Sequence, residues 1–164
     1  MELRKLDPTQ DAVRVGRLFL QSADFVRLTE GVEPGPPQVA QFFQGVPPGG
    51  DLAQSLKLGL FDGPALLGIA DLGYGYPEPD DAYIGLLLFA PEARGKGYGK
   101  ALLALIEEEA RAHGSDRIFA GVLEANAPAR AFWLREGYLP VMRRTLQVGA
   151  RTHRIDRMVK TLKR

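Results

Sequence analysis

The fold is decided by the stretch LFAPEARGKGYGKALLALIEEEARAHG, residues 88–114. An apolar run ends at Pro91, and a loop with three glycines and three basic residues follows it. Apolar side chains then recur every three or four positions up to Gly114, a pattern typical of a helix that ends at glycine. A strand, a glycine-rich loop and a helix are therefore expected in direct succession.

The loop combines glycines, whose backbone carries no side chain, with positively charged residues. Its alternating glycines are Gly95, Gly97 and Gly99, and its cations are Arg94, Lys96 and Lys100. A helix N-terminus exposes unpaired N–H groups and a partial positive charge, and glycine lets a bulky anion approach the backbone closely. Arginine can also bind a phosphate through two parallel hydrogen bonds. The loop predicts a diphosphate site; the alternative is a tight connection whose cations face solvent.

Two common nucleotide motifs do not fit this loop. The dinucleotide-binding pattern G-x-G-x-x-G fails because its last glycine would fall on Lys100 or Leu102. A P-loop fails because Ala101 stands where serine or threonine is needed, and Arg94 stands where the first glycine is needed. The diphosphate therefore belongs to another kind of ligand.

The remaining sequence predicts an alternation of strands and helices. Residues 9–28 suggest one helix or two short ones, and a further short helix is expected after the prolines at 36–37. Further helices are expected at 99–113 and 128–136, and strands at 1–6, 56–61, 65–72, 82–89, 117–123, 140–148 and 153–162. The apolar run 82–89 is typical of a strand buried on both faces. The unit 82–123 predicts a right-handed crossover between two parallel strands.

These elements predict one α/β (α+β) domain over residues 1–164. Its order is β-α-α-β-β-β-α-β-α-β-β, which corresponds to a mixed central sheet with helices on both faces. The composition fits this expectation, because 45% hydrophobic and 25% charged residues are ordinary for a globular protein.

Two motifs carry a resemblance to a known family. The pattern R-x-x-G-x-G, formed by Arg94, Gly97 and Gly99 after a strand, resembles the coenzyme A pyrophosphate loop of the GNAT superfamily of acyl-CoA-dependent N-acetyltransferases. The segment NAPARAFWLREGY, residues 126–138, resembles that superfamily's N-x-x-A-x-x-[FL]-[YW]-x-x-x-G-[FY]. Since the order of elements also matches, the resemblance covers essentially the whole chain.

The resemblance implies where acetyl-CoA binds. In this superfamily the two central parallel strands splay apart, and the pantetheine arm enters between them. Backbone N–H groups near 87–89 would then bind the acetyl carbonyl as an oxyanion hole. Asn126 would hydrogen-bond the pantetheine, with a local turn or helix cap as the alternative. The expected cofactor-binding residues are Leu87, Leu88, Phe89, Arg94, Gly95, Lys96, Gly97, Tyr98, Gly99, Lys100, Asn126, Phe132 and Trp133.

The sequence offers several candidates for the general acid and the general base. Many members of the superfamily have a tyrosine as general acid where this chain has Trp133, and an indole cannot donate a proton at useful pH. Trp133 would pack beside the thioester or simply in the core, and Tyr83 or Tyr138 could substitute as the acid. Candidate bases are Glu124, at the carboxyl end of a central strand, and Asp71, which interrupts an apolar strand. Their alternatives are a surface acid and a structural, hydrogen-bonded acid.

The expected function is acetyl transfer from acetyl-CoA to a primary amine of a small molecule or peptide, by direct attack in a ternary complex. A non-catalytic acyl-CoA-binding module is the alternative, and an interaction domain that uses the basic end is a third. Residues 143–164 hold eight Lys or Arg and one acid, whereas the acceptor-side loops 23–37 and 73–81 are acidic, so the acceptor cues conflict. No metal, nucleic acid or membrane is expected; the resemblance allows a homodimer. The absence of cysteine and of an N-terminal apolar segment favours the cytoplasm.

Overall fold

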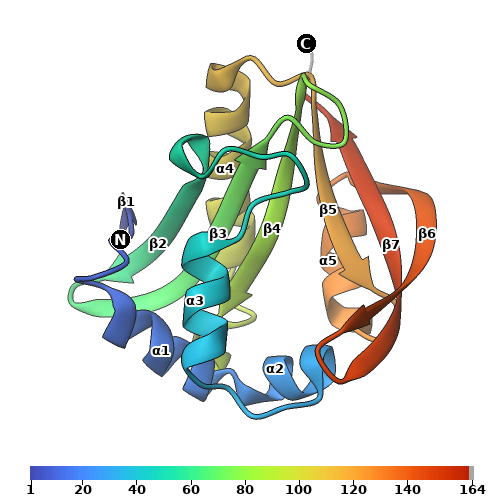
Figure 1. The fold of residues 1–164 in the computed structure, drawn as a ribbon. Coiled ribbons are helices and arrows are strands. Elements are labelled where there is room, and N and C mark those ends of the chain that lie inside the picture. Colours follow the sequence, from blue (N-terminus) through green and yellow to red (C-terminus); the bar gives the residue numbers. More distant parts are fainter. Residues whose placement is uncertain (163–164) are drawn as a thin grey trace.

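The computed structural model describes residues 1–162 and contains one mixed sheet with helices on both sides (Figure 1). The described strands are β1 (Glu2–Lys5), β2 (Leu56–Asp62), β3 (Ala65–Tyr74), β4 (Asp81–Phe89), β5 (Arg117–Leu123), β6 (Leu139–Val148) and β7 (Arg151–Thr161). The described α-helices are α1 (Ala12–Gln21), α2 (Ala23–Glu30), α3 (Pro36–Gln44), α4 (Tyr98–His113) and α5 (Ala127–Arg135). The predicted α/β class and sheet are confirmed.

The predicted order needs one correction, because three helices rather than two lie between β1 and β2. The chain breaks at the buried Ser22, whose backbone N–H donates to the carbonyls of Leu18 and Phe19 and so ends α1. α2 then begins at the next residue. α3 starts on two prolines, which suit the first helical turn because their missing N–H groups would be unpaired there anyway.

The sheet has the strand order β1-β2-β3-β4-β5-β7-β6, and only β4 and β5 run parallel among the described pairs. These two strands pair over a short register, from Asp81 opposite Arg117 to Ile84 opposite Ala120. β4 continues to Phe89 and β5 to Leu123, but beyond Ile84 and Ala120 these two strands no longer pair with each other. The expected splay of the central parallel strands is therefore present.

This splay corrects one expectation about β4. The apolar run predicts a strand buried on both faces, but Gly85 is exposed and Leu86 and Leu87 are half-buried. The neighbouring strand β5 diverges from β4 at this point. A bulge opposite β3, between Asp71 and Leu72, also leaves Gly85 outside the ladder.

Two hydrophobic cores cover the two faces of the sheet. One packs α1, α2 and α3 against one face, through buried residues such as Val15, Leu18 and Phe42. The other packs α4 and α5 against the opposite face, through residues such as Ile106 and Trp133.

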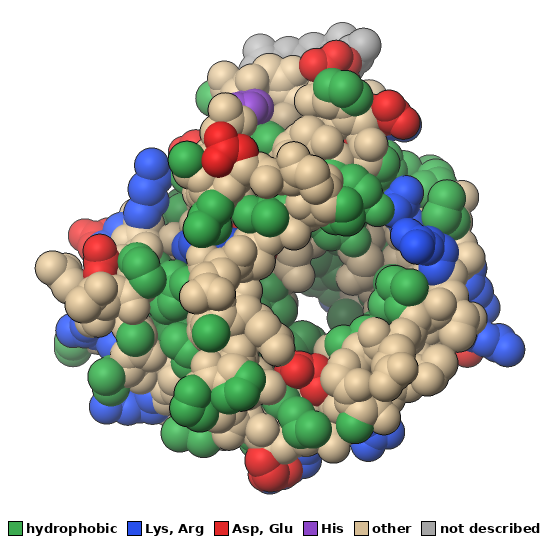
Figure 2. All heavy atoms as spheres, in the orientation of Figure 1, with side chains coloured by type: hydrophobic (Ala, Val, Ile, Leu, Met, Phe, Trp, Pro, Cys, Tyr) green, Lys and Arg blue, Asp and Glu red, His purple; other side chains and the backbone are tan. Residues whose placement is uncertain are grey.

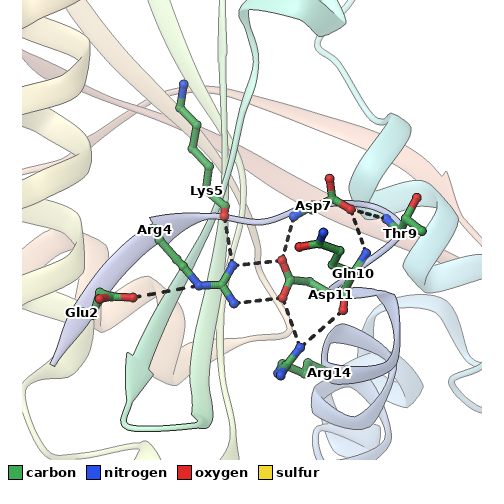
Figure 3. A network of polar contacts seen from close by, with 8 residues as sticks. All are labelled: Glu2, Arg4, Lys5, Asp7, Thr9, Gln10, Asp11 and Arg14. Atoms are coloured by element: carbon green, nitrogen blue, oxygen red, sulfur yellow. Dashed lines mark hydrogen bonds and ion pairs between the residues drawn. The ribbon is translucent and has the colours of Figure 1, made fainter.

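A polar network fixes the start of the chain (Figure 3). The Asp11 carboxylate, 1% exposed, accepts two hydrogen bonds of 3.0 Å from the Arg4 guanidinium and one of 2.8 Å from the backbone N–H of Asp7. The bond from Arg4 is the main reason that the pKa of Asp11 lies below its usual value. β1 is thereby tied to the beginning of α1.

The β6–β7 hairpin folds back onto α2 (Figure 1). The backbone N–H of Ala150 donates to the carbonyl of Glu30 at 2.8 Å, and Arg151 Nε donates to the carbonyl of Arg27 at 2.9 Å. His153 Nε2 lies 2.8 Å from the carbonyl oxygen of Thr29. These contacts close a ring around the space between the splayed strands.

Candidate functional site

A cavity of about 1540 Å³ opens where β4 and β5 separate. In the orientation of Figure 1, the surface is hollowed between α3 and the β6–β7 hairpin (Figure 2). The predicted cofactor-binding residues that line this cavity are Leu87, Leu88, Phe89, Arg94, Gly95, Gly97, Tyr98, Gly99, Lys100, Asn126, Phe132 and Trp133. Lys96 is exposed and does not line it. The two sequence motifs therefore converge on one cavity.

The glycine-rich loop needs its glycines for backbone geometry. Gly95 and Gly97 have φ values of 72° and 84°, a left-handed region that other residues rarely adopt. Gly97 is the N-cap of α4, so the loop delivers the unpaired N–H groups of that helix to the cavity. Gly99 has a different reason: a Cβ there would lie 3.2 Å from the Phe132 ring, because α4 and α5 approach closely.

Arg94 lines the cavity and also contacts two protein groups. Its guanidinium donates to the Asp24 carboxylate at 2.7 and 3.3 Å and to the Phe89 carbonyl at 3.0 Å. The bond from Arg94 lowers the pKa of Asp24. Arg94 therefore braces the loop against α2 and β4, and its planar fork is already engaged by protein groups.

Asn126 and Trp133 each combine a structural role with a place on the cavity wall. Asn126 Oδ1 accepts a 3.2 Å bond from the N–H of Ala129, so it caps α5. Trp133 is buried between Phe132 and Tyr138, with edge-to-face ring distances of 5.3 and 4.9 Å. Both therefore present fixed side chains to the cavity.

Tyr138 is positioned away from the cavity. Its hydroxyl donates to the buried Glu107 at 2.8 Å, and burial raises its pKa. The residue does not line the cavity and is held in the core behind Trp133. Of the two tyrosines considered as substitute acids, Tyr83 lines the cavity and Tyr138 does not.

Asp71 lies at the bulge between β3 and β4. Its side chain is 13% exposed and accepts a 2.8 Å bond from Lys57 Nζ, which also donates to the carbonyl of Gly45. A Cβ at Gly85 would lie 2.5 Å from Asp71 Oδ2, so the missing side chain of Gly85 makes room for the carboxylate. Burial raises the pKa of Asp71, and the bond and charge of Lys57 oppose that rise.

Tyr83 lies on the neighbouring side of the same gap. A Cβ at Gly121 of β5 would lie 2.9 Å from the Tyr83 hydroxyl, so glycine again makes room for a polar group. The ring packs edge-to-face on Tyr76 at 5.4 Å. Burial raises the pKa of Tyr83, and nearby Arg157 partly offsets that effect. Asp71 and Tyr83 both line the cavity.

Glu124 lies outside the cavity lining. It is 45% exposed and pairs with Arg143 at 2.8 Å and with Arg154 at 3.8 Å. Asp81, at the start of β4, is buried in a two-bond pair with Arg117 at 3.0 and 2.8 Å. Neither carboxylate is brought to the glycine-rich loop, whereas Asp71 is brought beside the splayed backbone.

Sequence reasoning missed the groups that surround Asp71 and Tyr83. Lys57 lies within an apolar strand, LKLGLF, and its interruption of that strand is the signal that could have paired it with Asp71. In the sequence, Arg144 and Arg157 stand out only as part of a basic end of the chain. Strand alternation in the hairpin could have placed both arginines on one face.

Two kinds of feature are absent from residues 1–162. No cluster of three His, Cys, Asp or Glu side chains there is arranged to hold a metal ion. No helix of that range is long and apolar enough to cross a membrane.

Comparisons with known proteins show the fold and family of this chain. A sequence search of curated proteins found no match. A solved acetyltransferase from Thermus thermophilus is 27% identical and aligns with a TM-score of 0.75, covering 98% of this chain and 96% of that one.

More distant structures share the fold. A ribosomal-protein-S18-alanine N-acetyltransferase from Escherichia coli is 16% identical, with a TM-score of 0.73 over 99% of this chain and 94% of that one. The Salmonella typhimurium protein yncA, solved with its cofactor acetyl-CoA, is 17% identical, with the same TM-score and coverage. The model of the acetyltransferase (GNAT) family matches residues 30–138, about two thirds of the chain. The chain is therefore a member of the GNAT acetyltransferase family.

Proposed function

We propose that the protein transfers an acetyl group from acetyl-CoA to a primary amine by direct attack in a ternary complex. The observation that carries this proposal is the end of β4–β5 pairing at Ile84 and Ala120, in the same cavity that the glycine-rich loop lines. Beyond that point β4 offers unpaired backbone groups to an extended ligand, while the start of α4 offers N–H groups to its diphosphate. Family membership supports the same donor.

The backbone of β4 supplies the electrostatic part of the reaction. N–H groups near 87–89 that point toward the gap have lost β5 as a partner. They can therefore donate to the thioester oxygen, on which negative charge develops when the amine attacks. The half-buried surroundings exclude much of the water that would weaken these bonds.

Asp71 is proposed as the general base. The amine nitrogen forms a bond to the carbonyl carbon, the carbon–sulfur bond breaks, and the proton released from nitrogen passes to the Asp71 carboxylate, directly or through water. A pKa raised by burial suits this role, because it brings the carboxyl closer to the pH at which proton transfer is efficient. Lys57 holds the carboxylate in place.

Tyr83 is proposed as the acid that protonates the departing thiolate. Burial raises its pKa, so the hydroxyl keeps its proton at neutral pH, as an acid must before the carbon–sulfur bond breaks. The resulting phenolate recovers its proton from solvent through the cavity. Trp133 then has a packing role, and the residue at that position need not transfer a proton.

The test measures cofactor binding and turnover separately. Calorimetry with acetyl-CoA should show binding in the wild type, and no binding would refute the proposal. Thiol release with a panel of primary amines should show turnover that Asp71→Asn lowers about 100-fold or more. Asp62→Asn, an exposed carboxylate in the β2–β3 hairpin, is the matched control and should turn over normally. Binding without turnover on any amine would instead support a non-catalytic acyl-CoA-binding module.

A further inference from the structure

A second cavity adjoins the reaction site on the side away from the glycine-rich loop. Its volume is about 490 Å³, within the usual range for small-molecule sites. It shares with the large cavity the residues Asp71, Tyr83, Gly85, Gly121, Leu146 and Ile155. Its remaining walls come from the segment 45–48 and from Tyr76, Arg144 and Arg157. An acceptor in this cavity would meet Asp71 and Tyr83 directly.

Two arginines face this cavity from the β6–β7 hairpin. Arg144 lies opposite Ile155, and Arg157 lies opposite Met142, so the two arginines are diagonal neighbours on one face of the hairpin. Side chains alternate between faces along a strand, and Ile155 lines both cavities. The register thus directs both guanidinium groups to the same wall.

The charges of these arginines are not neutralised by an acid in residues 1–162. Arg157 donates to the Tyr76 hydroxyl at 2.6 Å and lies over its ring at 5.2 Å, which fixes its direction without cancelling its charge. The neighbouring acid, Asp156, points to the opposite face, where Arg143 and Arg130 bind it at 2.8 and 3.1 Å. Positive charge is therefore concentrated on the cavity side.

Two of the acids in the acceptor-side loops 23–37 and 73–81 form ion pairs away from the second cavity. Glu33 pairs with Arg27 at 2.6 Å, and Asp81 pairs with Arg117. Asp71 is the carboxylate that lines the second cavity. The cavity thus has one acidic wall, at Asp71, and one basic wall, at Arg144 and Arg157. The side chains of Val46, Pro47 and Pro48 add an apolar surface.

We propose that the acceptor is a small zwitterionic amine, an amine that also carries a carboxylate or phosphate. Its amine lies at Asp71, where it is deprotonated, and its anionic group is bound by Arg144 and Arg157. Guanidinium groups bind both kinds of anion through charge-assisted hydrogen bonds. This inference rests on the proposed transfer function and adds the class of its acceptor.

The test compares amines that differ only in the anionic group. Phenylalanine is paired with phenylalaninamide, and phosphoethanolamine with ethanolamine, each with saturating acetyl-CoA. Charge-assisted bonds to one anion predict a preference in kcat/KM of roughly 10- to 100-fold for the anionic member of a pair. The pair with the larger preference distinguishes a carboxylate from a phosphate acceptor.

Variants of the hairpin locate the preference. Arg144→Gln should raise the KM for the anionic amine about 10-fold or more, and leave the KM for its uncharged partner and for acetyl-CoA unchanged. Arg157→Gln should raise the KM for the anionic amine by a similar factor and leave the KM for acetyl-CoA unchanged. Arg154→Gln is the matched control, because this exposed residue on the same hairpin points to the opposite face. Arg144 is exposed, so its replacement should also leave the melting temperature unchanged.

Two results would overturn the inference while leaving the transfer function intact. One is equal kcat/KM for both members of each pair in the wild type. The other is an unchanged preference in the double variant Arg144→Gln/Arg157→Gln. A complete absence of turnover on every amine, with acetyl-CoA still bound, would instead refute the transfer function, and the acceptor with it.

Discussion

The replacement Gly85→Ala should disable the proposed base without touching the cofactor loop. An added Cβ would lie 2.5 Å from Asp71 Oδ2, whereas ordinary contacts begin at 3.4 Å, so the carboxylate must retreat by about 0.9 Å. Its short side chain is held by Lys57 at 2.8 Å and cannot move away freely. A misplacement of about 1 Å in a reacting group costs roughly 100-fold in rate, or about 2.7 kcal/mol of transition-state stabilisation.

The assay is steady-state thiol release with acetyl-CoA and an accepted amine. We expect kcat to fall about 100-fold, with the KM for acetyl-CoA unchanged, because Gly85→Ala leaves the diphosphate-binding loop as it is. Gly16→Ala is the control, since its Cβ would meet the nearest side chain at an ordinary 3.6 Å. It should retain wild-type turnover, and its melting temperature should rise slightly, because alanine stabilises a helix interior by about 0.5–1 kcal/mol relative to glycine.

The double variant Gly85→Ala/Asp71→Asn decides the cause of the loss. If the alanine acts by displacing Asp71, it has little left to disturb once that carboxylate is gone, and the double variant should match Asp71→Asn alone. A further 100-fold loss in the double variant, or full activity in Gly85→Ala, would refute the reasoning.

Three other outcomes are expected. Gly97→Val should weaken acetyl-CoA binding at least 10-fold by calorimetry, because φ at Gly97 is 84° and the added side chain would lie in the diphosphate-binding loop. Gly63→Val is the control and should bind acetyl-CoA normally, since Gly63 has a similar φ of 57° but lies in the β2–β3 turn. The pKa of Asp11 is lower in the folded protein than in the unfolded chain, so the Asp11 carboxylate stabilises the fold above about pH 4. This stabilisation is lost as the pH falls through the pKa that Asp11 has in the folded protein. Urea titrations should therefore show less loss of stability on acidification in Asp11→Asn than in the wild type. Tyr138→Phe should lower the free energy of unfolding by about 1–3 kcal/mol, because Glu107 loses a buried hydrogen bond, and turnover should stay normal.

The limits of helices and strands are predicted best where glycines in the sequence mark their ends. β5 has the predicted limits, 117–123, and α4 differs by one residue at its start, because Gly114 and the glycine-rich loop mark the ends of these segments. The sequence does not decide between one helix and two around Ser22. The break there depends on how α1 and α2 pack against the sheet, and no glycine or proline marks it in the sequence.

Side-chain partners were harder to predict because they depend on register and distance along the chain. Arg94 carries a family motif, but its partner Asp24 lies 70 residues earlier, so the brace between them has no local signal. Glu124 is two residues from Asn126 in sequence, yet it turns toward Arg143 on the far face of the hairpin. Spacing alone does not say which face a residue takes where a strand gives way to a loop.

The divergence of β4 and β5 leaves two strand edges in the middle of a sheet, where most proteins have a continuous ladder. Backbone groups at such an edge exchange with solvent and contribute nothing to cohesion between the two halves. A ligand that fills the gap then acts as a missing structural element, joining the halves that the chain itself leaves apart. At a hundredfold excess over its dissociation constant, such a ligand adds about 2.7 kcal/mol to the free energy of unfolding. The stability of the folded protein therefore depends on the concentration of the ligand that fills this gap.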